Sequence, residues 1–267
     1  MSYRDVLVTI TVMVIMVISA VSQADSPKKH RGLCEIVYPS DVIVEWDCRT
    51  LQHGESLEKL FGEHWSNVAR FNRIDRRHAR PGLSIKVPRR LEELAEFTPL
   101  QLVYLPGERS KKFILIDLSE QFLGAYEFGA LRFATPITSG NGLNETPTGT
   151  FRVTAAHLQH QSDLYTIEET DRPYPMHYAL RFHVNRKGVS YSHGRDMPGY
   201  PASHGCIGLY DEQMQKEEYD LPKDPELNDA KRLFEWVLGS KVEEERVIPL
   251  PHGPRVHIIG QAPGDYP

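Results

Sequence analysis

From residue 113 to the C-terminus the chain is a succession of short segments in which apolar residues alternate with other residues, separated by turn residues. This period of two is typical of β-strands that bury one face. Only residues 229–238 have a clear helical periodicity. We therefore expect a mostly β fold with few helices, arranged as a sandwich or a barrel-like sheet. The predicted strands are 113–118, 122–128, 131–139, 149–155, 178–184, 189–192, 206–209 and 255–259.

Composition excludes several functional classes. The 267 residues are 40% hydrophobic and 25% charged, which is typical of a globular chain with a sizeable core. Lysine and arginine number 31, aspartate and glutamate number 36, and the formal net charge is -5. A nucleic-acid-binding surface is therefore not expected to be the main feature, and nucleic acid is not expected as a partner.

The N-terminus has the pattern of a secretory signal peptide. Residues 6–21 are an apolar run without charge, followed by Ser22-Gln23-Ala24. Small residues at the two positions that a signal peptidase reads predict cleavage after Ala24, which makes residues 1–24 the signal peptide. An uncleaved anchor is the alternative, although the run is shorter than the ~20 residues of a membrane span. In both cases we expect the protein outside the cytoplasmic membrane, either periplasmic or secreted.

The three cysteines are informative because that compartment permits disulfides. Cys34 and Cys48 lie near each other in the N-terminal region, and Cys206 is far from both. The economical arrangement pairs Cys34 with Cys48 and leaves Cys206 as a free thiol. A free thiol in an oxidising compartment is a liability unless the protein uses it.

Residues 42–90 have the pattern of a small module with the order strand, helix, helix, strand. A strand is predicted over 42–46, a helix follows the candidate N-cap Ser56, a second helix ends near Asn72, and a strand over 83–87 stops at Pro88. Residues 25–41 before the module are interpreted as a linker, and residues 91–110 as a connector. The apolar residues that define the pattern are Val42, Val44, Trp46, Leu57, Leu60, Phe61, Trp65, Val68, Phe71, Leu83, Ile85 and Val87.

This module resembles a LysM domain, a small βααβ module that binds glycans containing N-acetylglucosamine. The resemblance implies that it binds the glycan strands of peptidoglycan. A βααβ spacer without a ligand is the alternative. Cys48 and the arginines of the loop at 73–80 are less usual for such a module. The matching residues are Gly54-Glu55-Ser56-Leu57, Phe71-Asn72, Pro81-Gly82-Leu83 and Ile85-Lys86-Val87-Pro88.

The sharpest chemical signal is Ser203-His204-Gly205-Cys206, with another histidine at His193. A thiol attacks an acyl carbon poorly, but a neighbouring imidazole can accept its proton and lower the cysteine pKa into the range of about 3.5–7.5. His193 is predicted to end one strand and Cys206 to begin the next, so both are expected at one edge of a sheet. Gly205 lets the backbone turn and leaves N–H groups that can stabilise an oxyanion. Spacing alone does not decide which histidine is the base.

Residues 111–262 resemble the YkuD-type L,D-transpeptidase domain. Its signature is a His-Gly pair, a variable loop, and then Ser-His-Gly-Cys. The resemblance implies a YkuD-like β-sandwich or barrel, with few helices, behind the LysM-like module. The residues that carry it are His193-Gly194, Ser203-His204-Gly205-Cys206, Ile116-Asp117-Leu118-Ser119 with Gln121, and Thr138-Ser139-Gly140 leading to Thr146-Pro147-Thr148-Gly149-Thr150-Phe151.

The resemblance implies that Cys206 is the nucleophile and His193 the general base, with Ser203, His204 and Gly205 supporting an oxyanion. Such enzymes attack the bond between diaminopimelate and the terminal D-Ala of a peptidoglycan tetrapeptide stem and form a thioester. An amine on another stem, which gives a 3-3 crosslink, or on a wall-attached protein then resolves the thioester. The expected partners are stem peptides and glycan strands in the cell wall, and the chemistry implies neither a cofactor nor a metal.

One position departs from the family pattern. The family commonly has arginine, or sometimes asparagine, two residues after the cysteine, where this chain has Gly208. That position can supply a polar group near the substrate. Its loss is expected to weaken substrate binding or to change the acceptor, without affecting the thiol chemistry.

Other interpretations stay open. An L,D-carboxypeptidase, or a hydrolase that releases wall-linked protein, would use the same thioester with water as acceptor. A non-catalytic peptidoglycan-binding module would bind without thiol reactivity. A zinc site of His193, His204 and Cys206 has a sufficient number of ligands but no familiar spacing. The acidic runs 217–218 and 243–245 are interpreted as solvated faces. Histidines interpreted as surface or loop residues are His30, His157, His160 and His252.

Overall fold

The structure is a computed structural model that describes residues 32–95, 97–142, 144–167, 170–185, 188–241 and 245–264. The predicted signal peptide 1–24, the first part of the predicted linker 25–41, and His30 lie outside the described residues. Within the described ranges, no helix has both the length and the apolar character needed to cross a membrane.

The N-terminal module is built from two strands and two helices. Strand β1 (Trp46–Thr50) pairs antiparallel with β2 (Ser84–Pro88), and α1 (Leu57–Phe61) and α2 (Trp65–Asn72) come between them in sequence. Ser56 caps α1 as predicted, because its Oγ accepts the backbone N–H of Lys59 at 3.3 Å. The predicted order of strand, helix, helix and strand is confirmed.

The prediction that the first strand begins at Val42 is wrong. Pro39–Val42 is a short 3-10 helix (η2), Val42 is 86% exposed, and the strand begins only at Trp46. The backbone N–H of Tyr38 donates to Oδ2 of Asp41 at 2.9 Å, which closes a capping box around this turn. Pro39 fixes a φ that suits the first helical position, so local capping prevails over the alternation of valines.

The cysteine pairing is confirmed. Cys34, in the 3-10 helix η1 (Leu33–Glu35), forms a disulfide with Cys48 of β1, with a Cα–Cα distance of 5.9 Å. Cys206 is a free cysteine. The disulfide therefore fixes the segment before the module to the face of its hairpin.

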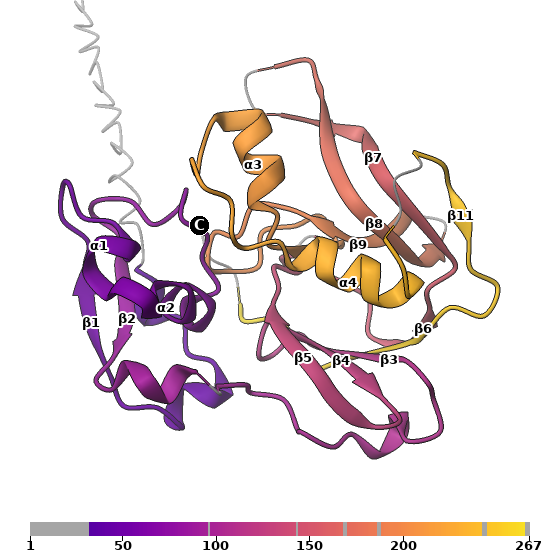
Figure 1. The fold of residues 1–267 in the computed structure, drawn as a ribbon, viewed down its shortest axis with the longest axis horizontal. Helices are drawn as coiled ribbons and strands as arrows, with labels where there is room; N and C mark the ends of the chain where they lie inside the picture. The colour runs from indigo at the N-terminus through magenta and orange to yellow at the C-terminus, as the bar shows by residue number, and fades with distance from the viewer. Residues whose placement is uncertain are drawn as a thin grey trace, which may run out of the picture.

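The C-terminal domain contains two five-stranded sheets. One has the order β5-β4-β3-β12-β6 and the other the order β10-β9-β8-β7-β11. Figure 1 shows helix α4 (Asp229–Leu238) between the two sheets, and its apolar face joins both of them in one core. The mostly β prediction is confirmed. The strands are β3 (Phe113–Asp117), β4 (Phe122–Glu127), β5 (Ala130–Pro136), β6 (Gly149–Arg152), β7 (Ala155–Thr166), β8 (Pro173–Asn185), β9 (Gly188–Gly194), β10 (Ile207–Leu209), β11 (Ile248–Pro249) and β12 (Arg255–Ile259).

Two features of this domain differ from the prediction. Strands β7 and β8 form a hairpin much longer than the predicted segments, and its outer half is mostly exposed, so apolar alternation does not mark it. Helix α3 (Glu212–Tyr219) was not predicted, because its sequence is almost entirely polar. Asp211 caps it by accepting the backbone N–H of Met214 at 3.0 Å. The acidic pair at 217–218 lies on this helix.

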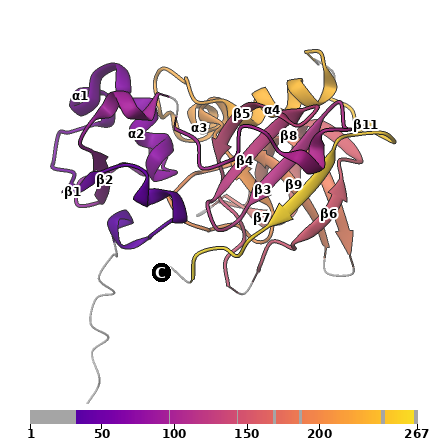
Figure 2. The ribbon, with the colours of Figure 1, turned by 90° about the horizontal axis from the view of Figure 1, so that it is seen from below.

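The module is not self-contained, because it shares an apolar core with the C-terminal domain. Met197, Tyr210 and Leu227 of the domain pack in the same cluster as the module's buried residues. Figures 1 and 2 show the module at one end of the two-sheet domain. The arginines of the loop at 73–80 cross this boundary, since Arg76 pairs with Glu212 at 2.5 Å and Arg77 with Asp196 at 2.7 Å.

Candidate active site

His193 and Cys206 belong to neighbouring parallel segments of one sheet. Strand β9 carries His193, and β10 begins one residue after Cys206. The two strands pair in parallel with Gly208 opposite His193, and β10 is the edge strand of its sheet. His193 thus lies on the strand next to the edge, and Cys206 directly before the edge strand.

The tautomer of His193 follows from its surroundings. The residue is 2% exposed, and its Nδ1 lies 2.7 Å from the carbonyl oxygen of Gly194. Because a carbonyl only accepts, Nδ1 carries the proton and Nε2 keeps its lone pair. Burial lowers the pKa of His193 to about 3, and the positive charge of Arg195 acts in the same direction. The imidazole is therefore neutral near pH 7 and able to accept a proton at Nε2.

Cys206 rests as a thiol. Burial raises its pKa above the ordinary value, while the backbone N–H of Tyr191, which donates to the thiol, and the charge of Arg195 oppose this shift only in part. The expected lowering of the cysteine pKa by a neighbouring histidine is therefore not found. The physical reason is that both groups are desolvated, which disfavours an ion pair of thiolate and imidazolium.

The turn before Cys206 is held by its own serine. Gly205 has φ +104, a conformation that favours glycine. Its backbone N–H donates to Ser203 Oγ at 3.1 Å, and Ser203 Oγ donates to the carbonyl of Cys206 at 2.6 Å. The N–H of Gly205 is therefore engaged inside the turn. This differs from the oxyanion role expected for Gly205 and gives Ser203 the role of positioning the turn.

The segment 138–140 supports the loop from the side. Thr138 exchanges two backbone hydrogen bonds with Gly208, at 3.0 and 2.8 Å, and Ser203 N–H donates to Ser139 O at 2.9 Å. Gly140 approaches so closely that a Cβ there would lie 2.9 Å from Cα of Gly205. The Thr138-Ser139-Gly140 segment thus supports the loop between His193 and Cys206, which we call the reactive loop.

Gln121 and Thr146 also support the reactive loop, through side-chain hydrogen bonds. Gln121 donates from Nε2 to Ser139 Oγ at 2.8 Å and accepts the backbone N–H of Ser139 at 3.0 Å. Thr146 Oγ1 accepts the backbone N–H of Gly140 at 2.9 Å and donates to the carbonyl of Gly205 at 3.2 Å. Motif residues far apart in sequence therefore meet around one loop.

His204 faces the outside of the site. Its side chain is exposed, and its ring stacks on Tyr165 at 4.2 Å between centroids with an interplanar angle of 20°. Tyr165 lies near the outer end of β7, so the β7–β8 hairpin reaches the reactive loop. Burial and the charge of Arg195 lower the pKa of His204. His193 and His204 thus occupy different environments, one enclosed and one at the surface.

Several residues near the site gave no signal in the sequence. Tyr191 contacts the thiol through its backbone, and His160 of β7 stacks on the Tyr191 ring at 4.8 Å between centroids. His160 and His157 beside it are partly buried and lie in β7, so they are not loop residues. His252 is exposed in a turn, as predicted. The hairpin pairing that brings His160 to Tyr191 is a long-range contact that local patterns do not encode.

The N-terminal module also reaches the reactive loop. Asp75 and Met197 are joined by two hydrogen bonds, from Asp75 N–H to Met197 O at 2.8 Å and from Met197 N–H to Asp75 Oδ2 at 2.7 Å. Tyr38 OH donates to the carbonyl of Gly199 at 3.1 Å, and Gly199 lies so close to Leu33 that a Cβ there would clash. The loop between His193 and Cys206 is thus held both by the module and by the segment before it.

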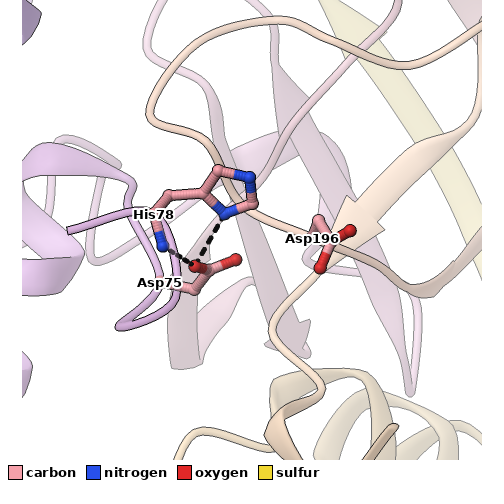
Figure 3. A group of neighbouring side chains, drawn as sticks. All are labelled: Asp75, His78 and Asp196. Carbon is pink, nitrogen blue, oxygen red and sulfur yellow. Dashed lines mark hydrogen bonds and ion pairs between the residues drawn. The ribbon is translucent and has the colours of Figure 1, made fainter. Parts of the chain in front are cut away.

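In the described part of the chain, Asp75, His78 and Asp196 form a group with the spacing of metal ligands (Figure 3). Protein donors already occupy it. Asp75 accepts from His78, Met197 and the Gln215 amide, and Asp196 accepts from Arg77 and the same amide. These side chains therefore take part in the contacts that hold the reactive loop against the module. His193, His204 and Cys206, considered above as zinc ligands, do not form such a group.

Solved structures similar to this chain include L,D-transpeptidases. One from Stackebrandtia nassauensis is 20% identical, with a TM-score of 0.41, and the match covers 77% of this chain and 70% of that chain. L,D-transpeptidase 1 from Mycobacterium tuberculosis is 19% identical, with a TM-score of 0.35, and the match covers 56% of this chain and 62% of that chain. L,D-transpeptidase 3 from the same organism is 15% identical, with a TM-score of 0.37, covering 56% of this chain and 61% of that chain.

No curated protein matches the chain. Residues 111–258, which include the whole His193–Cys206 region, match the YkuD family, described as the L,D-transpeptidase catalytic domain. This match covers more than half of the sequence. The chain therefore belongs to the YkuD family of L,D-transpeptidase catalytic domains.

Proposed function

We propose that the protein is a cysteine L,D-transpeptidase of peptidoglycan that works in the periplasm or outside the cell, in contact with the cell wall. The observations that carry the proposal are a free thiol at Cys206, directly before β10, and a buried, neutral His193 on the adjacent strand β9, whose Nδ1–H is bound to Gly194 O. That tautomer leaves Nε2 as the acceptor, which a general base requires.

Acylation follows from this resting state. The sulfur of Cys206 attacks the carbonyl carbon of diaminopimelate in the donor stem while its proton moves to Nε2 of His193. The tetrahedral intermediate collapses, the C–N bond to the terminal D-Ala breaks, and His193 returns the proton to the leaving amine. The products are a thioester on Cys206 and free D-Ala. Because the thiol is not ionised beforehand, proton transfer accompanies attack.

The thioester is then resolved by an amine. His193 takes a proton from the amine of a second stem or of a wall protein, the amine attacks the thioester carbonyl, and the C–S bond breaks with return of the proton to sulfur. The intermediate needs a donor for its oxyanion. The N–H of Gly205 is committed to Ser203, so the backbone N–H of Cys206 itself is the donor that we assign.

The N-terminal module has a supporting role in this proposal. Its βααβ order and LysM-like residues suggest binding to glycan strands, and its contacts with Met197 and Gly199 link it to the reactive loop. Glycan binding would bring the stems of the bound strand near Cys206. A signal peptide over residues 1–24 would deliver the protein to that compartment.

Mass spectrometry of residues 25–267 mixed with a disaccharide-tetrapeptide tests the proposal. The expected product is a crosslinked dimer that has lost one D-Ala, formed by the wild type and not by Cys206→Ala. A tripeptide monomer alone would instead show a carboxypeptidase. Unchanged substrate with both proteins would contradict the assigned reaction and favour a binding module. The Cys206→Ala protein should retain its fold, which circular dichroism verifies.

A further inference from the structure

Arg195 occupies the space that Gly208 leaves open. The backbone N–H of Arg195 donates to the carbonyl of Leu209 at 2.9 Å, which places it across from the end of β10. A Cβ built on Gly208 would lie 2.5 Å from Cγ2 of Thr138, and 2.7 Å from Cδ and 2.8 Å from Cβ of Arg195. Real Cβ atoms essentially never approach so closely. The stem of Arg195 can therefore lie against β10 only because position 208 has no side chain.

The guanidinium of Arg195 is held at the reactive loop. Its Nη2 donates to the carbonyl of Ala202 at 3.2 Å, one residue before Ser203, and its Cζ lies 5.2 Å from the ring centroid of Tyr174. A carbonyl and an aromatic ring thus fix the planar group between the two ends of the His193–Cys206 loop. The charge is close enough to the reacting groups to oppose in part the rise that burial causes in the pKa of Cys206, and to add to the lowering that burial causes in the pKa values of His193 and His204.

Arg195 has no carboxylate partner among the described residues, unlike the arginines of the module that reach the C-terminal domain. Arg70, Arg76 and Arg77 each pair with a carboxylate of the C-terminal domain. A guanidinium carries five N–H donors in a planar fork that matches a carboxylate. A fixed guanidinium with unused donors beside a nucleophile is suited to bind a carboxylate of the substrate.

We propose that Arg195 binds a carboxylate of the donor stem next to the scissile bond, and that Gly208 is required because it admits this arginine. The inference rests on the proposed function and adds a residue that determines donor specificity. The donor has a carboxylate on the terminal D-Ala, which adjoins the scissile bond, and another at the far end of the diaminopimelate side chain. Amidating one or the other identifies which of them Arg195 binds.

The test compares kcat/KM for three donors: the native tetrapeptide, its D-Ala carboxamide and its diaminopimelate carboxamide. In the wild type, one of the two amides should be about ten- to hundredfold worse than the native donor, as expected for loss of a charged hydrogen-bonded pair. Arg195→Gln should lower kcat/KM for the native donor by a similar factor and remove the discrimination. Arg132→Gln, which removes an exposed arginine of β5 paired with Glu127, is the matched control and should behave as the wild type.

The outcomes separate a binding role from a structural one. If Arg195→Gln slows all three donors equally and keeps the wild-type discrimination, the inference is overturned, because a merely structural role predicts that result. If Arg195→Gln does not fold, Arg195→Lys replaces it: this variant keeps the charge without the fork and should show reduced discrimination, and unchanged discrimination would overturn the inference. A wild type that turns over none of the donors would overturn the proposed function itself, and this inference with it.

Discussion

The backbone N–H of Met197 donates to Oδ2 of Asp75 at 2.7 Å, and this bond ties the loop between His193 and Cys206 to the N-terminal module. Asp75 is fully buried and also accepts from His78 and from the side-chain amide of Gln215. The module therefore contacts the loop between His193 and Cys206 directly.

Asp75→Ala should weaken both stability and activity. Removing the carboxylate leaves several buried donors without an acceptor, which costs about 3 kcal/mol in the free energy of unfolding. Urea denaturation measures that loss, and kcat/KM should fall with it because the loop loses its anchor. The control is Glu58→Ala, which removes a carboxylate of the same module that is paired with Arg76 but 39% exposed. If Asp75→Ala has the same stability and activity as the wild type, Asp75 does not anchor the reactive loop as described.

The pH dependence of kcat/KM should lack an acid limb near pH 6.5. His193 must be neutral to accept the proton, and its pKa of about 3 keeps it neutral well below pH 6. The rate should therefore stay flat between about pH 5 and 7, in contrast to an enzyme whose histidine has its ordinary pKa. A fall in rate centred near pH 6.5 would show that His193 is not desolvated as described.

The same lowered pKa makes stability depend on pH. In the unfolded chain His193 binds a proton below about pH 6.5, whereas the folded protein leaves it neutral down to about pH 3. The stability contributed by the neutral, buried ring is thus complete above pH 6.5 and is lost progressively as the pH falls towards 3, at about 1.4 kcal/mol per pH unit. Urea titrations at several pH values measure it, and His193→Gln should show a shallower slope. An equal slope in both proteins would argue against this assignment.

Alkylation of Cys206 by iodoacetamide should rise steadily with pH. Burial raises the pKa of the Cys206 thiol, so its thiolate fraction keeps increasing with pH across this whole range. An activated cysteine, whose pKa is lowered, would already be fully ionised within the range. The labelling rate should therefore increase through pH 6–9 without a plateau. A plateau near pH 6 would instead show a resting thiolate paired with imidazolium.

Ser203→Ala should impair turnover more than folding. The hydroxyl accepts from Gly205 N–H and donates to Cys206 O, so its loss frees both groups in the turn that carries the nucleophile. We expect the free energy of unfolding to fall by about 1–2 kcal/mol. We expect the activation free energy for turnover to rise by more than this, since the sulfur loses its fixed position. Ser139→Ala, which removes a hydroxyl one layer further from the sulfur, is the comparison. If both variants turn over like the wild type, the positioning role of Ser203 is wrong.

Local patterns predicted those parts of the fold that depend on local physics. The helix over 229–238, the strand over 255–259 and the cap at Ser56 follow from periodicity and side-chain hydrogen bonding, and the structure has each of them. The disulfide followed from counting cysteines. Helix α3 was missed because its stability comes from the Asp211 cap and packing of a few residues, with little apolar periodicity.

The candidate catalytic residues could be proposed from sequence, but their environment could not be predicted. His193 and Cys206 stand in recognisable motifs, whereas the burial that sets their pKa values depends on strands and loops far away in the chain. Arg195 carried no signal, because its relation to Gly208 exists only once β9 and β10 pair in parallel. The contact between Asp75 and the reactive loop likewise needs the packing of two separate parts of the chain.

The most direct test of the account is the intact mass of the protein after incubation with a disaccharide-tetrapeptide donor in the absence of an amine acceptor. We predict a covalent adduct equal to the donor minus D-Ala, mapped by peptide sequencing to Cys206 and absent in Cys206→Ala. His193→Gln should form it far more slowly. A wild-type protein that releases D-Ala without any adduct on Cys206, or that carries the adduct on another residue, would contradict the thioester mechanism.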